Sequence, residues 1–399
     1  MNEIYVYPIK SMLHDKDVID NNSKQLLDEL KKGTNYHYEI VTDIKKCDNH
    51  PTLILVQSGG SEGLFLSDVY PFFKGPYYLL TYGANNSLAA SLEILTFLHQ
   101  KNEKAEVLHG SIEYISERIN YLFSLKENED PDKLGVFGVP SDWLISSNVD
   151  YEKCKKIFNI ELIDYSNQEI EKRILDYINN DFQFEFKKVF DKNTLIKSYA
   201  IYEALRDLIK KDNLEGFTIR CFDVLMLTRQ SACFSLAKLN SENIVSSCEG
   251  DIPAMISAFI SMRLLGLPAF QVNPQEIDPV NNYVSFAHCT IPLNMVKDYE
   301  FMTHYESGLG LGIKGEVYEG DVTIFKIGAN LEEFYVTEGY MTQDDFSLTR
   351  CRTQVKIKLN GNASYFLRSS LGNHHQIIYG KHQDELVEYL TSLGLKRVI

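Results

Sequence analysis

The sequence predicts an α/β protein: two Rossmann-like parallel-sheet domains followed by a C-terminal, mainly antiparallel β-domain. The length of 399 residues corresponds to two or three domains of roughly 100–200 residues each. Short β-rich apolar runs alternate with helical patterns through residue 289, which is typical of a parallel sheet with helices on both faces. From residue 290 onward, β-rich runs separated by Gly and Asn predominate, which favours antiparallel sheet or a barrel.

The N-terminal domain is predicted to span residues 1–130. A helix is expected after Asn86-Ser87, because Leu88, Leu92, Leu95 and Leu98 recur at helical spacing behind a good N-cap. The polar segment 124–133 contains Pro131 and is the predicted linker. The strands are expected at 3–8, 52–57, 77–82 and 105–109.

The second α/β domain is predicted at 131–289 and the β-domain at 290–399. In the second domain, strands are expected at 134–139, 159–164, 217–222 and 243–248, and helices at 167–180, 195–211, 224–239 and 251–265. In the β-domain, the β-rich runs are 314–328, 333–340, 351–359, 363–368 and 376–379, with a closing helix at 382–393.

Composition narrows the class of partner. The formal net charge of −15 argues against nucleic acid and against an anionic membrane surface, which both require a basic face. No apolar run approaches the roughly 18–20 residues of a membrane span, and the N-terminus lacks the pattern of a signal peptide. The seven cysteines are widely spaced and include no Cys-x-x-Cys pair, so reduced thiols in a cytoplasmic protein are expected.

The densest group of acidic side chains is Cys248-Glu249-Gly250-Asp251-Ile252-Pro253, where a strand ends and a helix begins. Asp251 is a natural N-cap with Pro253 in the first turn, so a purely structural role is one interpretation. The other is a binding site, because ligands of α/β sheets bind at the carboxyl ends of strands. Carboxylates there suit Mn²⁺ or Mg²⁺.

Histidines form the second group. His374 and His375 are adjacent, so they point to opposite faces if the segment is a strand, and at most one would face a given site. His288 ends an apolar run and reads as a hydrogen-bonded core residue, whereas His304 lies in a loop where it can bind substrate. The glycines of 308–312 lack the Gly-Lys-Ser/Thr ending of a phosphate loop and indicate a turn or bulge.

Seven short motifs together resemble the L-fucose isomerase / L-arabinose isomerase family, in its shorter fucose-isomerase-like members. Their order and spacing span nearly the whole chain. They are Asn85–Glu93, Gly138–Leu144, Thr218–Phe222, Cys248–Ala254, Ala287–Thr290, Cys351–Val355 and Gly372–His375.

The resemblance implies aldose–ketose isomerisation of an open-chain sugar at a Mn²⁺ (or Mg²⁺) site, in a homo-oligomer of three or six chains. The metal ligands of the family are two carboxylates and a histidine. Asp251 matches the second carboxylate, and His374 or His375 matches the histidine, with His375 favoured. Glu249 would be the third ligand or the acid/base, and Asp251 would share the catalytic role. The residues expected to bind substrate are Arg220, His288, His304, Arg352, Gln354 and His374; for Arg220, Arg352 and Gln354 the alternative is an ordinary strand-surface role.

The chain departs from the family at one position. The first carboxylate of the family, a glutamate, is expected at Met226 or Leu227, and the only acid nearby is Asp223. Either Glu249 or Asp223 substitutes for it, or the reaction differs. The second hypothesis is therefore a non-catalytic sugar-binding protein or a lyase-like descendant.

Overall fold

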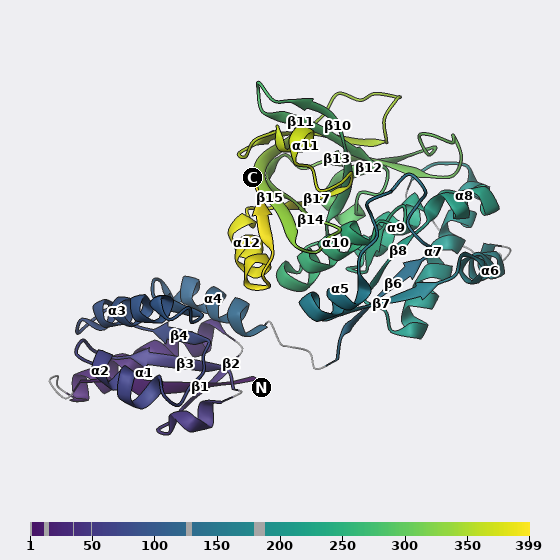
Figure 1. Ribbon diagram of the computed structural model, residues 1–399. Coiled ribbons are helices and arrows are strands. Elements are labelled where there is room, and N and C mark those ends of the chain that lie inside the picture. The colour runs from purple at the N-terminus through teal and green to yellow at the C-terminus, as the bar shows by residue number, and fades with distance from the viewer. Residues whose placement is uncertain (1, 12–15, 35, 49, 125–129, 179–187) are drawn as a thin grey trace. The chain divides into compact units, whose positions relative to one another are not determined.

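The computed structural model describes residues 1–399 except 1, 12–15, 35, 49, 125–129 and 179–187. By internal contacts the chain divides into two compact units, Met1–Glu127 and Asn128–Ile399 (Figure 1). Half of the predicted linker at 124–133, residues 125–129, lies outside the described residues, and its last part is the start of a strand at Asp132. Among the described residues, no helix combines the length and the hydrophobicity that crossing a bilayer requires.

The first unit is a parallel five-stranded sheet in the order β2-β1-β3-β4-β5, with helices on both faces. One core packs Ile4 and Val6 against α1 and α4, and the other packs Ile54 and Val56 against α3. The strands are β1 (Asn2–Ile9), β2 (Tyr36–Ile40), β3 (Thr52–Val56), β4 (Tyr77–Leu80) and β5 (Ala105–Leu108). The helices are α1 (Lys16–Gly33), α2 (Glu62–Leu64), α3 (Ser87–Gln100) and α4 (Ile112–Ser124), with short turns η1 (Ile44–Cys47) and η2 (Phe65–Val69).

The second unit begins with a parallel four-stranded sheet in the order β7-β6-β8-β9. Its strands are β6 (Asp132–Phe137), β7 (Ile160–Tyr165), β8 (Gly216–Ile219) and β9 (Val245–Ser247). Its helices are α5 (Tyr151–Phe158), α6 (Asn167–Ile178), α7 (Lys192–Asp212), α8 (Cys221–Thr228), α9 (Cys233–Ser241) and α10 (Ile252–Leu265).

The rest of the second unit is an antiparallel barrel. Its strands pair in the order β14-β17-β10-β11-β16-β15, and β15 pairs back to β14, which closes the ring. The ring strands are β10 (Phe270–Asp278), β11 (Tyr283–His288), β14 (Gly320–Ile327), β15 (Glu333–Gln343), β16 (Thr353–Leu359) and β17 (His375–Tyr379). The remaining elements are β12 (Val296–Met302), β13 (Gly312–Val317), β18 (Lys396–Val398), η3 (Leu293–Met295), α11 (Tyr365–Arg368) and α12 (Gln383–Ser392).

These sheets confirm the predicted fold class, two parallel α/β sheets followed by an antiparallel β-domain. Details differ. Residues 270–288, predicted within the second α/β domain, form β10 and β11 of the barrel, because their pairing partners lie far along the chain in β16 and β17. The single helix predicted at 224–239 is two helices, α8 and α9, because Arg229 takes a left-handed conformation with φ of 57°. The run 363–368, expected to be β-rich, contains helix α11.

Helix α10 connects the four-stranded sheet to the barrel (Figure 1). The Ser257 hydroxyl donates to the carbonyl of Pro253 at 2.7 Å and accepts the backbone N–H of Ile327 in β14 at 2.9 Å. The Gln376 side chain in β17 donates to the carbonyl of Ala254 at 2.9 Å. These bonds hold the first turn of α10 against two barrel strands, and this junction carries the site described below.

We expect Ser257→Ala to lower the free energy of unfolding by about 1–3 kcal/mol, because the buried Ile327 N–H loses its acceptor. Ser261→Ala is the matched control on the same helix, since the Ser261 hydroxyl donates to the carbonyl of Leu267. The control should lose less than about 1 kcal/mol. Denaturant unfolding of both variants measures the difference, and equal losses would contradict this role of Ser257.

Candidate metal centre

The site begins at the turn between β9 and α10. Glu249 and Gly250 both adopt positive φ, 64° and 72°. A side chain at position 250 would lie 2.8 Å from the carbonyl oxygen of Val139, so only glycine fits there. A left-handed glutamate costs about 1–3 kcal/mol and persists where surrounding contacts fix it, which often happens at functional sites.

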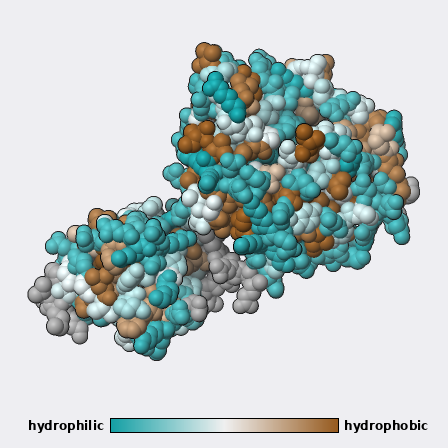
Figure 2. All heavy atoms as spheres, in the orientation of Figure 1, coloured by the Kyte–Doolittle hydropathy of each residue, from teal (hydrophilic) through white to brown (hydrophobic). Residues whose placement is uncertain are grey.

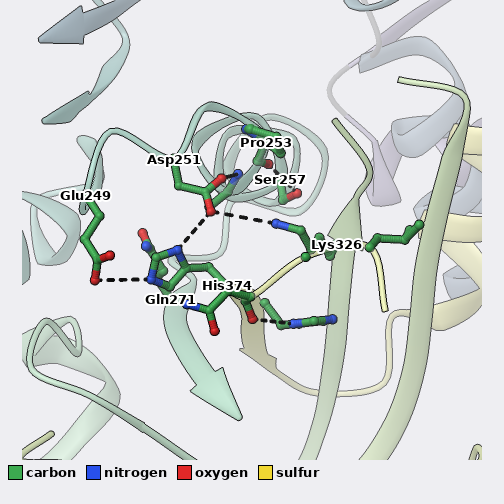
Figure 3. Close-up of polar contacts among 12 residues, drawn as sticks. Glu249, Asp251, Pro253, Ser257, Gln271, Lys326 and His374 are labelled. Carbon is green, nitrogen blue, oxygen red and sulfur yellow. Dashed lines mark hydrogen bonds and ion pairs between the residues drawn. The ribbon is translucent and has the colours of Figure 1, made fainter. Parts of the chain in front are cut away.

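Asp251 is fully buried and has two roles. Its Oδ1 accepts the N–H of Ala254 at 2.8 Å, which caps α10 as predicted. Its Oδ2 accepts a hydrogen bond from Nδ1 of His374, at 2.9 Å, and lies 3.9 Å from Nζ of Lys326 in β14. Figure 3 shows the His374 ring between Asp251 on one side and Glu249 on the other. Asp251 therefore has the predicted helix-capping role, and its second carboxylate oxygen faces His374 and Lys326.

Glu249, His288 and His374 offer one ligand atom each, and these atoms all lie within 4.8 Å of one another. Nε2 of His374 lies 3.5 Å from Oε1 of Glu249, and the rings of His288 and His374 are 5.5 Å apart. The other glutamate oxygen accepts the indole N–H of Trp143 at 2.7 Å. Nδ1 of His288 contacts the Thr290 hydroxyl at 2.8 Å, which orients that ring.

Burial and neighbouring charges give the ionisable side chains of the site different protonation states. Burial by itself raises the pKa of Glu249, but the charge of His374, whose Nε2 lies 3.5 Å from the carboxylate, and the hydrogen bond from Trp143 outweigh it and bring the pKa to about 2. Burial likewise opposes ionisation of Asp251, and Lys326 and His374 hold its pKa below the usual range. Burial disfavours a charged His374, yet the two carboxylates raise its pKa to about 9. Burial lowers the pKa of His288 to about 4. At neutral pH, His374 is thus charged and His288 neutral.

This donor set can hold a divalent metal ion. Nε2 of His374 is buried without a well-formed hydrogen bond, although it faces Glu249. Nδ1 of the same ring is held by Asp251, the usual arrangement of a metal-ligating histidine with a carboxylate behind it. One carboxylate and two imidazoles suit Mn²⁺, Fe²⁺ or Zn²⁺ better than Mg²⁺, which prefers oxygen ligands. A metal ion would displace the proton of His374.

The structure separates the two adjacent histidines. His375 lies on the opposite face of β17, in the barrel core, where its Nε2 lies 3.1 Å from the Tyr365 hydroxyl and its ring packs against Phe366. Burial lowers its pKa to about 3. His374, not the favoured His375, is therefore the histidine beside Asp251 and Glu249. The two side chains point to opposite faces, as predicted for a strand, but the histidine that faces the site is His374 and not His375.

A pocket lies beside the triad. Its wall includes Glu249 and His288 of the triad, together with His304 and Glu306. The remaining lining residues are apolar, small or sulfur-containing: Cys221, Phe222, Leu225, Ser231, Ala232, Cys233, Cys248, Asn273, Cys289 and Cys351. His304 contacts the Ser307 hydroxyl through Nδ1 at 3.0 Å and packs against Phe222.

Three other predicted substrate residues are engaged elsewhere. Arg220 pairs with Asp142 and Asp223, at 3.0 and 2.9 Å, and donates to the carbonyl of Pro140. The Gln354 side chain bonds the backbone of Ser347 and Cys351. These contacts give Arg220 and Gln354 loop-holding roles.

Arg352 is also held by backbone. Its Nε donates to the carbonyl of Thr303 at 2.8 Å, while its buried Nη1 has no hydrogen-bond partner. It lines a separate hollow on the barrel with Tyr299 and Phe346, not the pocket beside the triad.

No carboxylate of helix α8 lines the pocket. Met226 and Leu227, where the resemblance places a glutamate, are 71% and 37% exposed, and the α8 residues on the pocket wall include Leu225. Asp223 is engaged by Arg220 and Asn167. In place of the two carboxylates and one histidine implied by the resemblance, the structure groups one carboxylate and two histidines that can hold a metal ion, with Asp251 behind His374.

Sequence reasoning missed three residues of the site. Lys326 is only 2% exposed. The sequence feature that could have identified it is a single lysine within the apolar run Thr323–Ile327. Gly372 is needed beside it, because a side chain there would lie 2.9 Å from Lys326 Cε. Trp143 lies in one of the quoted motifs but more than a hundred positions from Glu249, so only the fold reveals their contact.

Comparisons with known proteins point to sugar isomerases at low identity. No protein-family model matches the chain. The chain is similar to the sulfoquinovose isomerase of Clostridium sp. (strain MSTE9), 25% identical over 209 residues, which are 49% of this chain and 46% of the relative. It is 28% identical to that of Alkalicoccus urumqiensis over 156 residues, 38% and 34% of the two chains. It is 23% identical to that of Priestia aryabhattai over 282 residues, 66% and 63%.

The matched region thus spans less than two thirds of the length of each of these relatives. The names of these relatives agree with the class that the sequence motifs indicate, the sugar isomerases. They do not mention L-fucose or L-arabinose.

The pKa of His374 predicts how stability depends on pH. The folded protein holds the His374 proton with a pKa of about 9, above the ordinary 6.5. The stabilisation is therefore fully present below pH 6.5 and is lost as the pH rises through 9. We expect the free energy of unfolding, measured in a chelator, to fall between pH 6.5 and pH 9. In His374→Gln this fall should be smaller, and an unchanged pH dependence in the variant would contradict the assignment.

Proposed function

We propose that the chain is a metal-dependent aldose–ketose isomerase that acts on an open-chain sugar. The observation that carries the proposal is the buried set of Glu249, His288 and His374 beside a pocket, in a chain similar to proteins named sulfoquinovose isomerase. Mn²⁺ is the metal that we infer, because the family resemblance implies it and the donor set of one carboxylate and two imidazoles accommodates it.

The residues of the site would have three roles: holding a metal ion, positioning a histidine and fixing a carboxylate. Glu249, His288 and His374 would hold a divalent cation, which would supply positive charge to stabilise the negative charge that develops on the sugar during the reaction. Asp251 fixes the tautomer and the position of His374, and Lys326 lies 3.9 Å from the same carboxylate oxygen, so Asp251 is a positioning residue here. Trp143 fixes the Glu249 carboxylate.

Proton transfer between the two carbons requires a further group on the pocket wall. We infer that Glu306 serves, because it lines the pocket outside the triad at a solvent-exposed position, and partial desolvation there raises its pKa above the ordinary value. A raised pKa brings a carboxyl closer to the neutral range in which it can both accept and return a proton. His304, on the same wall, would hold a sugar hydroxyl.

The test is metal-dependent interconversion of a panel of sugars that includes sulfoquinovose, L-fucose and D-arabinose. We expect activity with Mn²⁺ that chelation abolishes. Glu249→Gln should lower kcat/KM at least about 100-fold, because a ligand for the charge that stabilises the transition state is lost. Asp251→Asn should lower it by about 10–100-fold, as expected for a residue behind a metal ligand.

Glu316→Gln is the matched control, because Glu316 is an exposed barrel residue remote from the triad in its contacts. It should change kcat/KM less than about twofold. Metal binding without turnover of any sugar would favour the alternative, a sugar-binding descendant. That outcome has a basis in the chain itself, since Met226 and Leu227 occupy the positions where the family's glutamate is expected, and the neighbouring Leu225 lies on the pocket wall. A chain that binds no metal at all would overturn the proposal.

We further propose that the chain forms a homo-oligomer of three or six copies. Apolar side chains are exposed on the loop after β6 and on α8, close to the site: Val139, Trp143, Ile145, Met226 and Leu227. Trp143 packs against Phe222, one turn from Met226 on α8, which links the two segments. The face in Figure 2 is mostly hydrophilic with separate hydrophobic patches, so grouped apolar side chains are a candidate interface.

We expect sedimentation to give a mass of about three or six times the 45.8 kDa of one chain. The double variant Ile145→Glu/Met226→Glu should shift the protein to smaller species, because two charges would be buried unpaired in the interface. Val280→Glu, at an 89% exposed position of the β10–β11 turn, should leave the mass unchanged. A monomeric wild type would contradict this proposal.

A further inference from the structure

Two cysteines lie in contact directly behind the candidate metal centre. Sγ of Cys221 and Sγ of Cys248 are 3.2 Å apart, and both cysteines are free. Cys221 opens helix α8 just after β8, and Cys248 directly follows β9, the parallel neighbour of β8. Two adjacent strands therefore bring to one point thiols that are 27 positions apart.

Both thiols belong to the pocket wall. Cys221 is 8% exposed and Cys248 is 4% exposed, and both line the pocket that also contains Glu249 and His288. A small oxidant that enters the pocket thus meets the pair, as well as Cys233, Cys289 and Cys351 of the same wall, whereas the buried Cys154 of helix α5 is remote from it. The Cys221 and Cys248 sulfur atoms are the two in direct contact beside Glu249.

The pair is connected to Glu249 by two routes. Glu249 follows Cys248 in the chain at a left-handed φ of 64°. Phe222 follows Cys221 and packs edge-on against Trp143 at 4.9 Å, and the Trp143 indole donates to Glu249 at 2.7 Å. Cys221, Phe222, Trp143, Glu249 and Cys248 thereby form a closed ring of contacts. A change in the distance between the two sulfur atoms is transmitted to the carboxylate from both sides.

We propose that Cys221 and Cys248 form a reversible disulfide on reaction with a peroxide, and that this bond displaces Glu249 from the metal centre. A disulfide has its sulfur atoms about 2.05 Å apart, so the two must approach by about 1 Å. The formation of the bond stands on the thiol geometry alone. Its effect on metal binding rests on the proposed function.

The chemistry balances with hydrogen peroxide as oxidant. The Cys221 sulfur attacks one peroxide oxygen, the O–O bond breaks, and water leaves as the sulfur becomes a sulfenic acid. The Cys248 sulfur then attacks the Cys221 sulfur, the S–O bond breaks, and a second water leaves as the S–S bond forms. Two thiols are oxidised and one peroxide is reduced. A dithiol reductant restores both thiols by exchange.

Trypsin makes the bond easy to identify in the full-length protein. Cleavage after Arg220 and Arg229 isolates Cys221 in peptide 221–229, and cleavage after Lys238 and Arg263 isolates Cys248 in peptide 239–263. After treatment with hydrogen peroxide and alkylation of the remaining thiols, we expect these two peptides to be linked, and to separate with dithiothreitol. If both appear alkylated while other cysteines are linked, the proposal is overturned.

The single tryptophan reports the effect on Glu249 without any metal. Oxidation should change Trp143 fluorescence reversibly in the wild type and in Cys154→Ser, but not in Cys248→Ser. A linked pair with unchanged fluorescence would overturn the coupling to Glu249. The oxidised wild type should bind Mn²⁺ at least about tenfold more weakly than the reduced protein. Should the reduced protein bind no Mn²⁺, the proposed function fails, while the peptides and the fluorescence still decide this inference.

Discussion

The hydrogen bond between Asp251 and His374 is the interaction on which the arrangement of the site depends. It joins the first turn of α10, at the end of the four-stranded sheet, to the start of β17 in the barrel. Both side chains are fully buried, so each would be costly without the other. Because Asp251 also caps α10, the orientation of the helix and that of the imidazole are fixed by one carboxylate. The pocket, Glu249 and His288 are placed around that junction.

Charge balance explains why so many ionisable groups can be buried here. Glu249 and Asp251 are held ionised, while His374 and Lys326 supply two positive charges around them. Burial lowers the pKa of Lys326, and Asp251 opposes that shift. The closed barrel and the parallel sheet thus share a compact group of charges that is neutral in sum. A cation can enter such a group by replacing the His374 proton, without leaving an unpaired carboxylate.

The sequence predicted the layers of the fold because the patterns that indicate strands, helices and turns are local. Apolar runs, caps and turns identified both parallel sheets, and Asp251 before Pro253 marked the start of α10. The barrel membership of Phe270–His288 was not visible, because it depends on pairing with strands about seventy or more positions later. The break between α8 and α9 was missed because it occurs at Arg229, which adopts a left-handed conformation although it is not a glycine.

The site was predicted in part for the same reason. Glu249 and Asp251 were identified from their place at a strand end, but their partner His374 lies 123 positions from Asp251. Alternation along a strand shows that His374 and His375 face apart, yet not which one faces the site. The engagement of Arg220 and Gln354 with loops depends on side-chain contacts that spacing does not encode.

The register of β17 has a consequence for how this site can change over time. Gln376 is paired with Gln271 of β10 and with Phe325 of β14, and this pairing alone decides which histidine faces α10. A slip of the strand by one residue that places His375 where His374 now lies would bring its imidazole toward Asp251, while His374 would move to the place of Asn373. The same slip turns the apolar side chains of β17 to the other face of the strand, so the barrel core would have to repack. The second histidine thus provides a donor after a slip in this direction, whereas a strand with a single histidine would lose it.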